Sequence, residues 1–295
     1  MQPRLRLSGH RTGLLLVIVA DTIWSTVFVA SQIALQYSNP YNVTFLRFLV
    51  AALAIGVLVV LFDKKIGVFK QMRNRWIWVL GIIYAVAFVL QYVGQNLTSA
   101  PETTLLTNLD PILIPPFAVA LLKDRITKPQ LVAMVLGLFG LILVTSPRIG
   151  GSQLELIGDV LLFTTSIAYT FFTVYTKKFG VSSVGGSFAI ILIVALLAFP
   201  VALFLGGLGP SDFLIATAGW EAIIYLSIPC TVIAVALYLK GLSGVKASEA
   251  GFLFLIQILV GLTLSWLLLD QFFNLTQALG AAIIIVALSF GLSRK

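Results

Sequence analysis

Three ionisable side chains, Asp21, Asp110 and Arg47, lie inside long apolar runs of this sequence. A charge in the middle of a membrane costs about 2.5–3.5 kcal/mol on insertion scales, so such residues usually face a cavity or a partner. If the runs are membrane-spanning helices, Asp21 and Asp110 both lie near mid-membrane, within roughly 6 Å of each other in depth at about 1.5 Å per residue. A carboxyl there could bind a proton, a cation or a substrate amine, or it could make a helix–helix hydrogen bond. We predict that both carboxyls take part in substrate binding or coupling.

Arg47 lies about one turn inside its apolar run. It could attract a substrate carboxylate or pair with one of the acids. Its shallow depth favours a structural ion pair, and Glu102 is a candidate partner. Glu102 opens the next-but-one span, where a carboxylate also interacts favourably with the helix dipole.

Three prolines follow Asp110 closely: Pro111, Pro115 and Pro116. Proline lacks an amide donor and therefore kinks or opens a helix. Freed carbonyls at membrane depth are tolerated beside protein or water. We predict a kinked helix that carries an acid and acts as a gating element; the alternative is a static kink shaped for packing.

Polar and aromatic residues recur at helical spacing along several runs, and Thr173 and Tyr238 belong to such stripes. Lipid would not solvate these faces, so we expect them to line a cavity or a close helix interface. Besides the two aspartates, the predicted substrate-binding residues are Trp24, Ser25, Phe28, Tyr84, Phe88, Gln91, Gln95, Thr107, Tyr169 and Gln257.

The composition identifies the elements that must position these side chains. Of the 295 residues, 59% are hydrophobic and only 10% are charged, and the mean hydropathy is +1.06. A soluble domain carries about 25% charged residues, so this chain suits a bilayer and not water. We predict an all-α integral membrane protein with ten spans, at 13–36, 43–62, 76–97, 103–122, 129–146, 154–175, 184–205, 220–239, 247–269 and 276–292.

The basic residues orient these spans. With the tail 1–12 in the cytoplasm, every one of the 19 Lys and Arg residues falls in a cytoplasmic segment, except Arg148 and the intramembrane Arg47. This agrees with the positive-inside rule and places both termini, including the short tail 293–295, in the cytoplasm. The net charge of +8 is therefore an orientation signal, and we expect no nucleic-acid partner.

An internal repeat joins the two halves of the chain. Segments 97–133 and 244–280 align without gaps at an offset of 147, which places Glu102 on Glu249, Asp110 on Gln257 and Gln130 on Gln277. Five spans separate the copies, and an odd number inverts the second copy. Inverted repeats are common in secondary transporters, with the substrate site between them near the midplane. We predict two inverted five-helix repeats, 13–146 and 154–292.

Several short motifs resemble the ten-helix EamA-type permeases of the drug/metabolite transporter superfamily. They are the segment WSTVFVA at 24–30, Arg47-Phe48 followed by small residues, Pro111, the turn DRIT at 124–127, and Gly158-Asp159 near the start of the second half. Lys123 and Asp124 replace the Gly-Glu of the family's turn, and Gln271 stands where the second half would carry an acid. The resemblance implies a secondary carrier of small metabolites, often an exporter. Such a carrier works by alternating access without ATP. The resemblance also implies a multi-pass protein in the cell membrane (inner or plasma membrane) of a prokaryote.

Other function classes lack their residues. Cys230 is the only cysteine, and the only histidine, His10, lies in the basic N-terminal tail before the first span, so His–Cys zinc sites and Ser–His–Asp triads lack their parts. We predict that the protein is not an enzyme and binds no metal or cofactor. Its expected partners are a small-molecule substrate, the lipid bilayer and protons as a coupling ion. The expected substrate is a small polar or amphipathic metabolite such as an amino acid or amine. The alternative functions are an uptake carrier for a cationic nutrient, a membrane-embedded lipid enzyme and a non-transporting subunit. The sequence leaves open whether the protein is a monomer or a homodimer.

Overall fold

The computed structural model describes residues 3–98, 100–145, 152–269 and 274–292. All regular structure in these residues is helical. The first half contains α1 Pro3–Trp24, α2 Val27–Leu35, α3 Pro40–Ile66, α4 Val68–Met72, α5 Arg75–Leu97, α6 Ala100–Thr107, α7 Asp110–Leu122 and α8 Lys128–Thr145. The second half contains α9 Gln153–Lys178, α10 Val184–Phe204, α11 Thr217–Ser227, α12 Ala234–Leu242, α13 Ala247–Leu253, α14 Leu255–Leu269 and α15 Leu275–Gly291. Two short segments complete it, a 3₁₀ turn Pro210–Phe213 and a π-helix Ile228–Ile233.

Eight helical stretches in the described residues are long and apolar enough to cross a membrane, which agrees with the first eight predicted spans. They are Gly9–Leu35, Pro40–Phe62, Arg75–Leu97, Glu102–Leu122, Lys128–Thr145, Gln153–Lys178, Val184–Phe204 and Thr217–Leu242. The last two predicted spans fall on shorter apolar helices, Ala247–Gly261 and Leu275–Gly291. The multi-pass membrane architecture is therefore supported by eight helices, and the count of ten stays a prediction.

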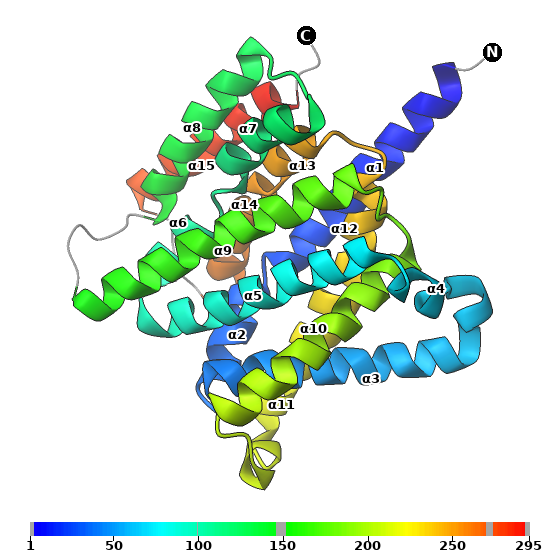
Figure 1. The fold of residues 1–295 in the computed structure, drawn as a ribbon. Helices are drawn as coiled ribbons and strands as arrows, with labels where there is room; N and C mark the ends of the chain where they lie inside the picture. Colours follow the sequence, from blue (N-terminus) through cyan, green and yellow to red (C-terminus); the bar gives the residue numbers. More distant parts are fainter. Residues whose placement is uncertain (1–2, 99, 146–151, 270–273, 293–295) are drawn as a thin grey trace.

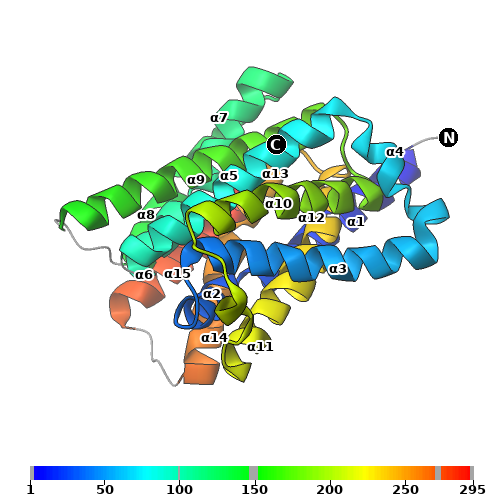
Figure 2. The same ribbon diagram turned by 60° about the horizontal axis from the view of Figure 1, so that its bottom comes forward.

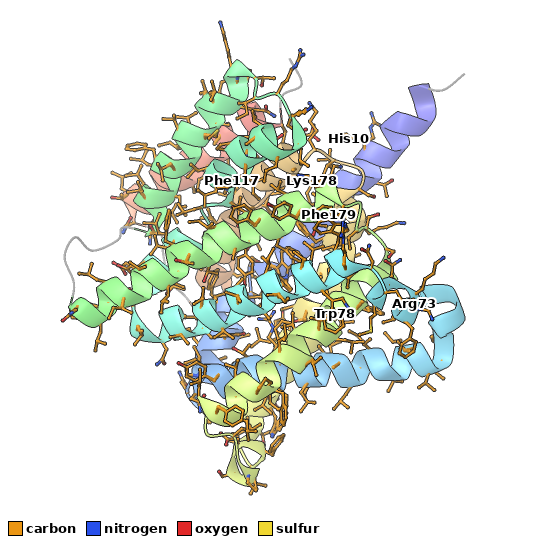
Figure 3. The ribbon with its side chains drawn as sticks, in the orientation of Figure 1. His10, Arg73, Trp78, Phe117, Lys178 and Phe179 are labelled. Atoms are coloured by element: carbon orange, nitrogen blue, oxygen red, sulfur yellow. The ribbon has the colours of Figure 1, made fainter. Side chains whose placement is uncertain are left out.

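Helices α3, α5, α9 and α10 run in roughly the same direction in the view of Figure 2. Helices distant in sequence pack together. The chief pairs are α8 with α15, α5 with α9, α3 with α10, and α1 with α12. Apolar side chains point outward, as Val60, Val135 and Phe204 do at 86%, 69% and 79% exposure, and Figure 3 shows side chains projecting from the long helices all round. Arg47, Asp21 and Asp110 are buried. This distribution suits a lipid solvent.

Glycines allow several of these helices to touch. A Cβ at Gly94 of α5 would lie 2.9 Å from the carbonyl oxygen of Gly158 on α9, and one at Gly241 of α12 would lie 2.8 Å from that of Gly13 on α1. Small residues permit close backbone approach between membrane helices. Gly94 and Gly241 are 147 residues apart, the offset of the internal repeat.

Four interruptions lie within the spans. The first span breaks at Ser25 and Thr26 and the fourth at residues 108–109, while α13 and α14 meet at Phe254 and the eighth span contains the π-helix. At two of these breaks a side-chain hydroxyl bonds to a carbonyl of the preceding turn: Ser25 donates to Thr22 O at 2.6 Å, and Thr107 donates to Thr103 O at 2.6 Å. The break in the fourth span, at residues 108–109, lies before the three prolines of that span.

The three prolines have different places relative to that break. Pro111 is the second residue of α7, where a missing amide hydrogen costs little. Pro115 and Pro116 lie inside α7, which continues to Leu122. The break of this span lies six to seven residues before Pro115, and the predicted proline kink and its gating role stay predictions.

Candidate functional site

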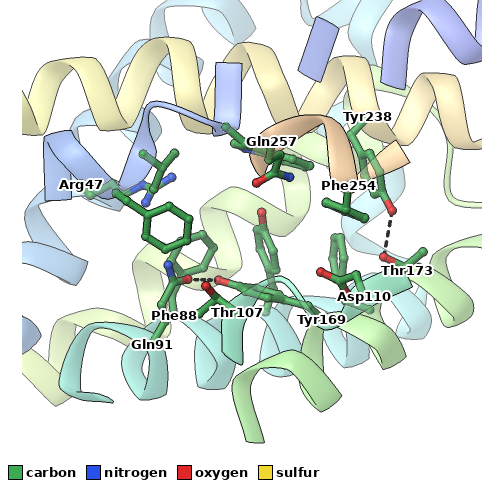
Figure 4. Close-up of a pocket in the computed structure, with 15 residues that line it drawn as sticks. Arg47, Phe88, Gln91, Thr107, Asp110, Tyr169, Thr173, Tyr238, Phe254 and Gln257 are labelled. Carbon is green, nitrogen blue, oxygen red and sulfur yellow. Dashed lines mark hydrogen bonds between the residues drawn. The ribbon is translucent and has the colours of Figure 1, made fainter. Parts of the chain in front are cut away.

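The interruptions surround a central cavity lined by both halves of the chain (Figure 4). Its empty space is about 650 Å³, including the part open to the outside. The lining residues are Trp24, Val27, Phe28, Arg47, Tyr84, Phe88, Gln91, Thr107, Asp110, Tyr169, Phe172, Thr173, Tyr238, Phe254 and Gln257.

Most of the residues that we predicted for substrate binding line this cavity; Asp21, Ser25 and Gln95 do not. Asp21 lies directly behind the lining, because Gln257 Nε2 donates to its Oδ1 at 3.3 Å. Gln95 Nε2 donates instead to Ser31 Oγ at 2.9 Å, and that pair is buried. The structure thus places one predicted carboxyl, that of Asp110, in the cavity lining. The other, that of Asp21, is separated from the cavity by Gln257.

Aromatic rings form much of the wall. Trp24 contacts Tyr238 with ring centres 5.1 Å apart and stacks on Phe254 at 6.1 Å. On the other side Tyr84 stacks on Phe172 at 4.3 Å and meets Phe88 edge-on at 4.8 Å. Such geometries add stabilisation to the packing of each ring. The wall offers stacking surfaces to an apolar or aromatic part of a ligand.

Hydrogen bonds hold several of these side chains in place. Trp24 Nε1 donates to the carbonyl of Cys230 in the π-helix at 2.8 Å. The hydroxyls of Thr173 and Tyr238 lie 2.9 Å apart, and the Tyr169 hydroxyl donates to Gln91 Oε1. These bonds link α9 to α5 and α12, so the polar lining is held in place before a ligand arrives.

Asp110 is the only acid among the described residues of the lining. It is the first residue of α7, where a carboxylate interacts favourably with the helix dipole, and it is only 3% exposed. Its Oδ1 has no hydrogen-bond partner among the described residues. This oxygen can therefore accept a hydrogen bond from a water or a ligand in the cavity.

Arg47 is the one basic residue in the part of the lining that the structure describes, and its hydrogen-bond partners are neutral. Its Nε donates to Thr231 Oγ1 and its Nη1 to Tyr92 Oη, both at 2.8 Å. The guanidinium carbon lies 4.6 Å from the centre of the Phe88 ring. Within the part of the chain that the structure describes, no acidic group lies within 4.0 Å of it. Neutral partners therefore occupy the place of the ion pair with Glu102 that we predicted.

The lining also contains residues that we did not predict, namely Val27, Phe172 and Phe254. Apolar residues in an apolar helix give no sign of which face they occupy. Phe254 could have been found, because the 147-residue offset places it on Thr107, a predicted binding residue. Both residues lie at the interruptions of their spans.

No three His, Cys, Asp or Glu side chains in the described ranges lie close enough together to hold a metal ion. The polar groups available to a ligand in the cavity are a guanidinium, a carboxyl, amides and hydroxyls. Such a set can bind a small organic molecule by hydrogen bonds and charge.

Comparison with known proteins gives consistent matches. A sequence model of the EamA-like transporter family matches residues 11–146 and again residues 156–292. The uncharacterized transporter YetK of Bacillus subtilis (strain 168) is 25% identical over 251 residues, which cover 81% of this chain and 74% of YetK. An uncharacterized transporter of Clostridium kluyveri is 21% identical over 293 residues, 94% of this chain and 91% of its own.

The fold also matches a known crystal structure. The TM-score is 0.81, and the match covers 96% of this chain and 97% of the other. At 19% identity this likeness shows the fold alone.

Proposed function

The chain belongs to the EamA-like transporter family, and we propose on that basis that it is a secondary active transporter of a small polar or amphipathic metabolite, such as an amino acid or amine. The observation that carries the proposal is the central cavity, in which a buried carboxyl and a buried guanidinium face a space walled by aromatic rings. Such a site can recognise a molecule by charge at one end and by apolar contact along its body. We propose export from the cell as the direction.

The proposed architecture is ten spans in two inverted five-helix repeats. Two features support it. The family's sequence model matches the chain twice, over ranges close to the predicted repeats. The pairing of α5 with α9 also has a counterpart in the pairing of α12 with α1, and in both pairs a glycine approaches a glycine carbonyl. A two-fold relation between the halves would produce this duplication.

The proposed cytoplasmic face lies at the end where α12 leads into α13. The side chain of Lys177 donates to the carbonyls of Leu242 and Val245 there, at 2.8 and 2.5 Å. His10, in the N-terminal part of α1, lies 3.8 Å from Glu249, and Gly291, the last residue of α15, packs against Phe252. His10, Lys178 and Arg73 all lie toward the right in Figure 3. Both ends of the described chain and several basic residues therefore gather on one side, which supports cytoplasmic termini.

The packing of the broken helices suggests which side of the cavity is closed. Near the proposed cytoplasmic face, α7 packs on α13, and a Cβ at Gly251 would lie 3.0 Å from Ile114 Cβ. The other halves of these spans diverge, because α6 packs on α8 and α9 whereas α14 packs on α1 and α15. We infer a state closed toward the cytoplasm, and alternating access would open this end and close the other.

Asp110 and Asp21 are the proposed coupling groups. Both carboxyls are buried, and Gln257 joins the second of them to the cavity wall. A carboxyl in such a place can take up a proton, a cation or a substrate amine. Coupling to the proton gradient would then supply the energy for export.

The test is transport by the purified chain in proteoliposomes. Counterflow with a panel of labelled amino acids and amines should identify at least one solute with saturable exchange, and an imposed pH gradient should alter its net flux. Accumulation of cationic nutrients alone would favour an uptake carrier. Absence of saturable flux for every solute, with the chain correctly inserted, would remove the transport function.

A further inference from the structure

Arg47 is a buried cation that lacks a counter-charge in the described protein. It is 1% exposed in the second span and lines the cavity. The one close approach of a basic and an acidic side chain among the described residues is that of His10 to Glu249, which does not involve Arg47. Burial of an uncompensated charge is strongly unfavourable, so buried charges are normally paired. The partner of this guanidinium has to come from elsewhere.

The guanidinium also has donors to spare. Arginine carries five N–H groups, and the described hydrogen bonds use one on Nε and one on Nη1. The Phe88 ring covers one face of the cation, which stabilises it without supplying an acceptor. Since Arg47 lines the cavity, its remaining donors can reach a ligand there.

We propose that Arg47 binds the carboxylate of the transported molecule, and that Thr231 and Tyr92 are positioning residues for its guanidinium. The inference rests on the proposed transport function and narrows it to solutes that carry a carboxylate. A planar guanidinium can bind a carboxylate through two parallel hydrogen bonds, which fixes the orientation of the ligand as well as its charge.

The π-helix explains how Thr231 is presented. The Thr231 hydroxyl donates to the carbonyl of Leu226, five residues earlier, at 2.7 Å. In an α-helix a threonine hydroxyl bonds the carbonyl three or four residues back; the wider turn at Ile228–Ile233 allows the longer step. With its proton used on Leu226, the Thr231 oxygen must accept, and it accepts from Arg47 Nε. π-helical turns of this kind are frequent at functional sites.

Tyr92 holds the guanidinium from the same repeat as Arg47, whereas Thr231 belongs to the other repeat. It is fully buried on α5, and its hydroxyl oxygen accepts from Nη1. Arg47 therefore has one neutral acceptor from each half of the chain, and its position depends on how the halves meet. A conformational change that moved α5 relative to the eighth span would move the carboxylate site with it.

The other charged lining residue favours a ligand with a second charge. Asp110 and Arg47 lie on opposite sides of the view in Figure 4, with aromatic side chains between them. A carboxylate at Arg47 and an ammonium near Asp110 would suit a zwitterion with an apolar body. The carboxylate is the group of the ligand that Arg47 is proposed to bind.

Three probes of similar size separate the contributions of the two charges: 3-phenylpropanoate carries only the carboxylate, phenethylamine only the ammonium, and phenylalanine both. Each is titrated into the purified full chain, and the rise in melting temperature gives an apparent affinity, because ligands that bind the native state stabilise it. We expect 3-phenylpropanoate and phenylalanine to bind. Arg47→Gln should weaken both at least about tenfold, the usual effect of losing a hydrogen bond to a charged group, and leave phenethylamine unchanged.

The positioning residues give a second, independent test. Thr231→Val keeps the shape and removes the acceptor, so the affinity for 3-phenylpropanoate should fall, whereas Thr231→Ser should restore it. In transport, Thr231→Val should raise the KM for the carboxylate solute and leave the maximal rate nearly constant. Tyr92→Phe should act in the same direction. These variants decide the matter if Arg47→Gln fails to fold.

Equal binding of 3-phenylpropanoate by wild type and Arg47→Gln, or no binding of it by wild type, would overturn the inference. Flux of a labelled carboxylate solute that is insensitive to Arg47→Gln and Thr231→Val would do the same while leaving the transport function intact. Conversely, Arg47-dependent binding without any flux in proteoliposomes would keep the carboxylate site and remove the transport function.

Discussion

Asp110 and Gln257 line the same cavity from repeat-equivalent positions, 147 residues apart. Asp110 is the first residue of α7 and Gln257 the third of α14, so each stands just after the interruption of its span. One is an acid, whereas the other is a neutral amide that donates to Asp21. The two halves thus have a similar backbone at this position but side chains of different charge. Among the described lining residues, the first half supplies the carboxyl and the second half supplies none.

That asymmetry predicts the effect of Asp110→Asn. Asparagine keeps the shape of the side chain but cannot take up a proton or pair with an ammonium. We expect the transport rate in proteoliposomes to fall at least about tenfold, equivalent to about 1.4 kcal/mol, and its dependence on pH to flatten. The matched control is Glu155→Gln, at the first turn of α9, where glutamine can still serve the capping box. An Asp110→Asn protein with normal rate and normal pH dependence would exclude this residue from coupling.

Gly251 predicts a way to open the cavity toward the cytoplasm. A Cβ there would meet Ile114 Cβ at 3.0 Å and the Asp110 carbonyl at 3.3 Å, so Gly251→Val should push α13 away from α7. A cysteine at position 107, in a Cys230→Ala background, should become more reactive to an impermeant thiol reagent from the cytoplasmic side and less so from outside. Gly56→Val is the control, because no atom of the described residues lies within 4 Å of its added Cβ. Equal labelling in both glycine variants would argue against α7 and α13 as a closed gate.

The same repeat predicts the contact that closes the other side. At the 147-residue offset, Gly251 corresponds to Thr104 and Ile114 to Gly261. Among the described residues, a Cβ at Gly261 would come no closer to another atom than 3.8 Å, the distance to the Ser25 carbonyl. If the halves exchange conformations during transport, Thr104 should approach Gly261, and cysteines at both positions should form a disulfide, which requires Cβ atoms about 3.5–4.5 Å apart. Oxidation should then stop transport reversibly in the double variant, while each single variant stays active.

Much of this arrangement could be predicted from the sequence, for a physical reason. A span must be a helix of about 20 apolar residues, so a polar residue such as Asp110 or Gln91 signals an inward face. The partners of Arg47 could not be predicted in the same way. Tyr92 is 45 residues away and Thr231 is 184, and the latter depends on a π-helix that no periodicity signals. Phe172 was missed because its side chain would suit lipid equally well.

Asp124, in the loop between α7 and α8, predicts a pH dependence outside the spans. Partial burial raises its pKa above the usual value, while Lys246 and Lys177 act in the opposite direction. A raised pKa in the folded state means that folding favours the protonated carboxyl, so the free energy of unfolding should fall as pH rises through that pKa. Asp124→Asn should therefore raise the melting temperature slightly at neutral pH and have little effect in acid below the usual aspartate range. A drop in melting temperature at neutral pH would show that the two lysines outweigh burial.

The glycine crossings provide the sharpest test of the two-fold relation between the halves. Gly94→Ala would place a methyl group 2.9 Å from the Gly158 carbonyl, and Gly241→Ala would place one 2.8 Å from the Gly13 carbonyl. Backbone cannot move aside as a side chain can, so each variant should lose about 1–3 kcal/mol of stability, the usual cost of overpacking. Gly56→Ala, on the open face of α3, should be neutral or slightly stabilising, because alanine favours the helix. Thermal unfolding in detergent measures all three. Similar losses at the two crossings would show that they are equivalent contacts, whereas a loss at only one would mean that the halves pack differently despite their aligned sequence.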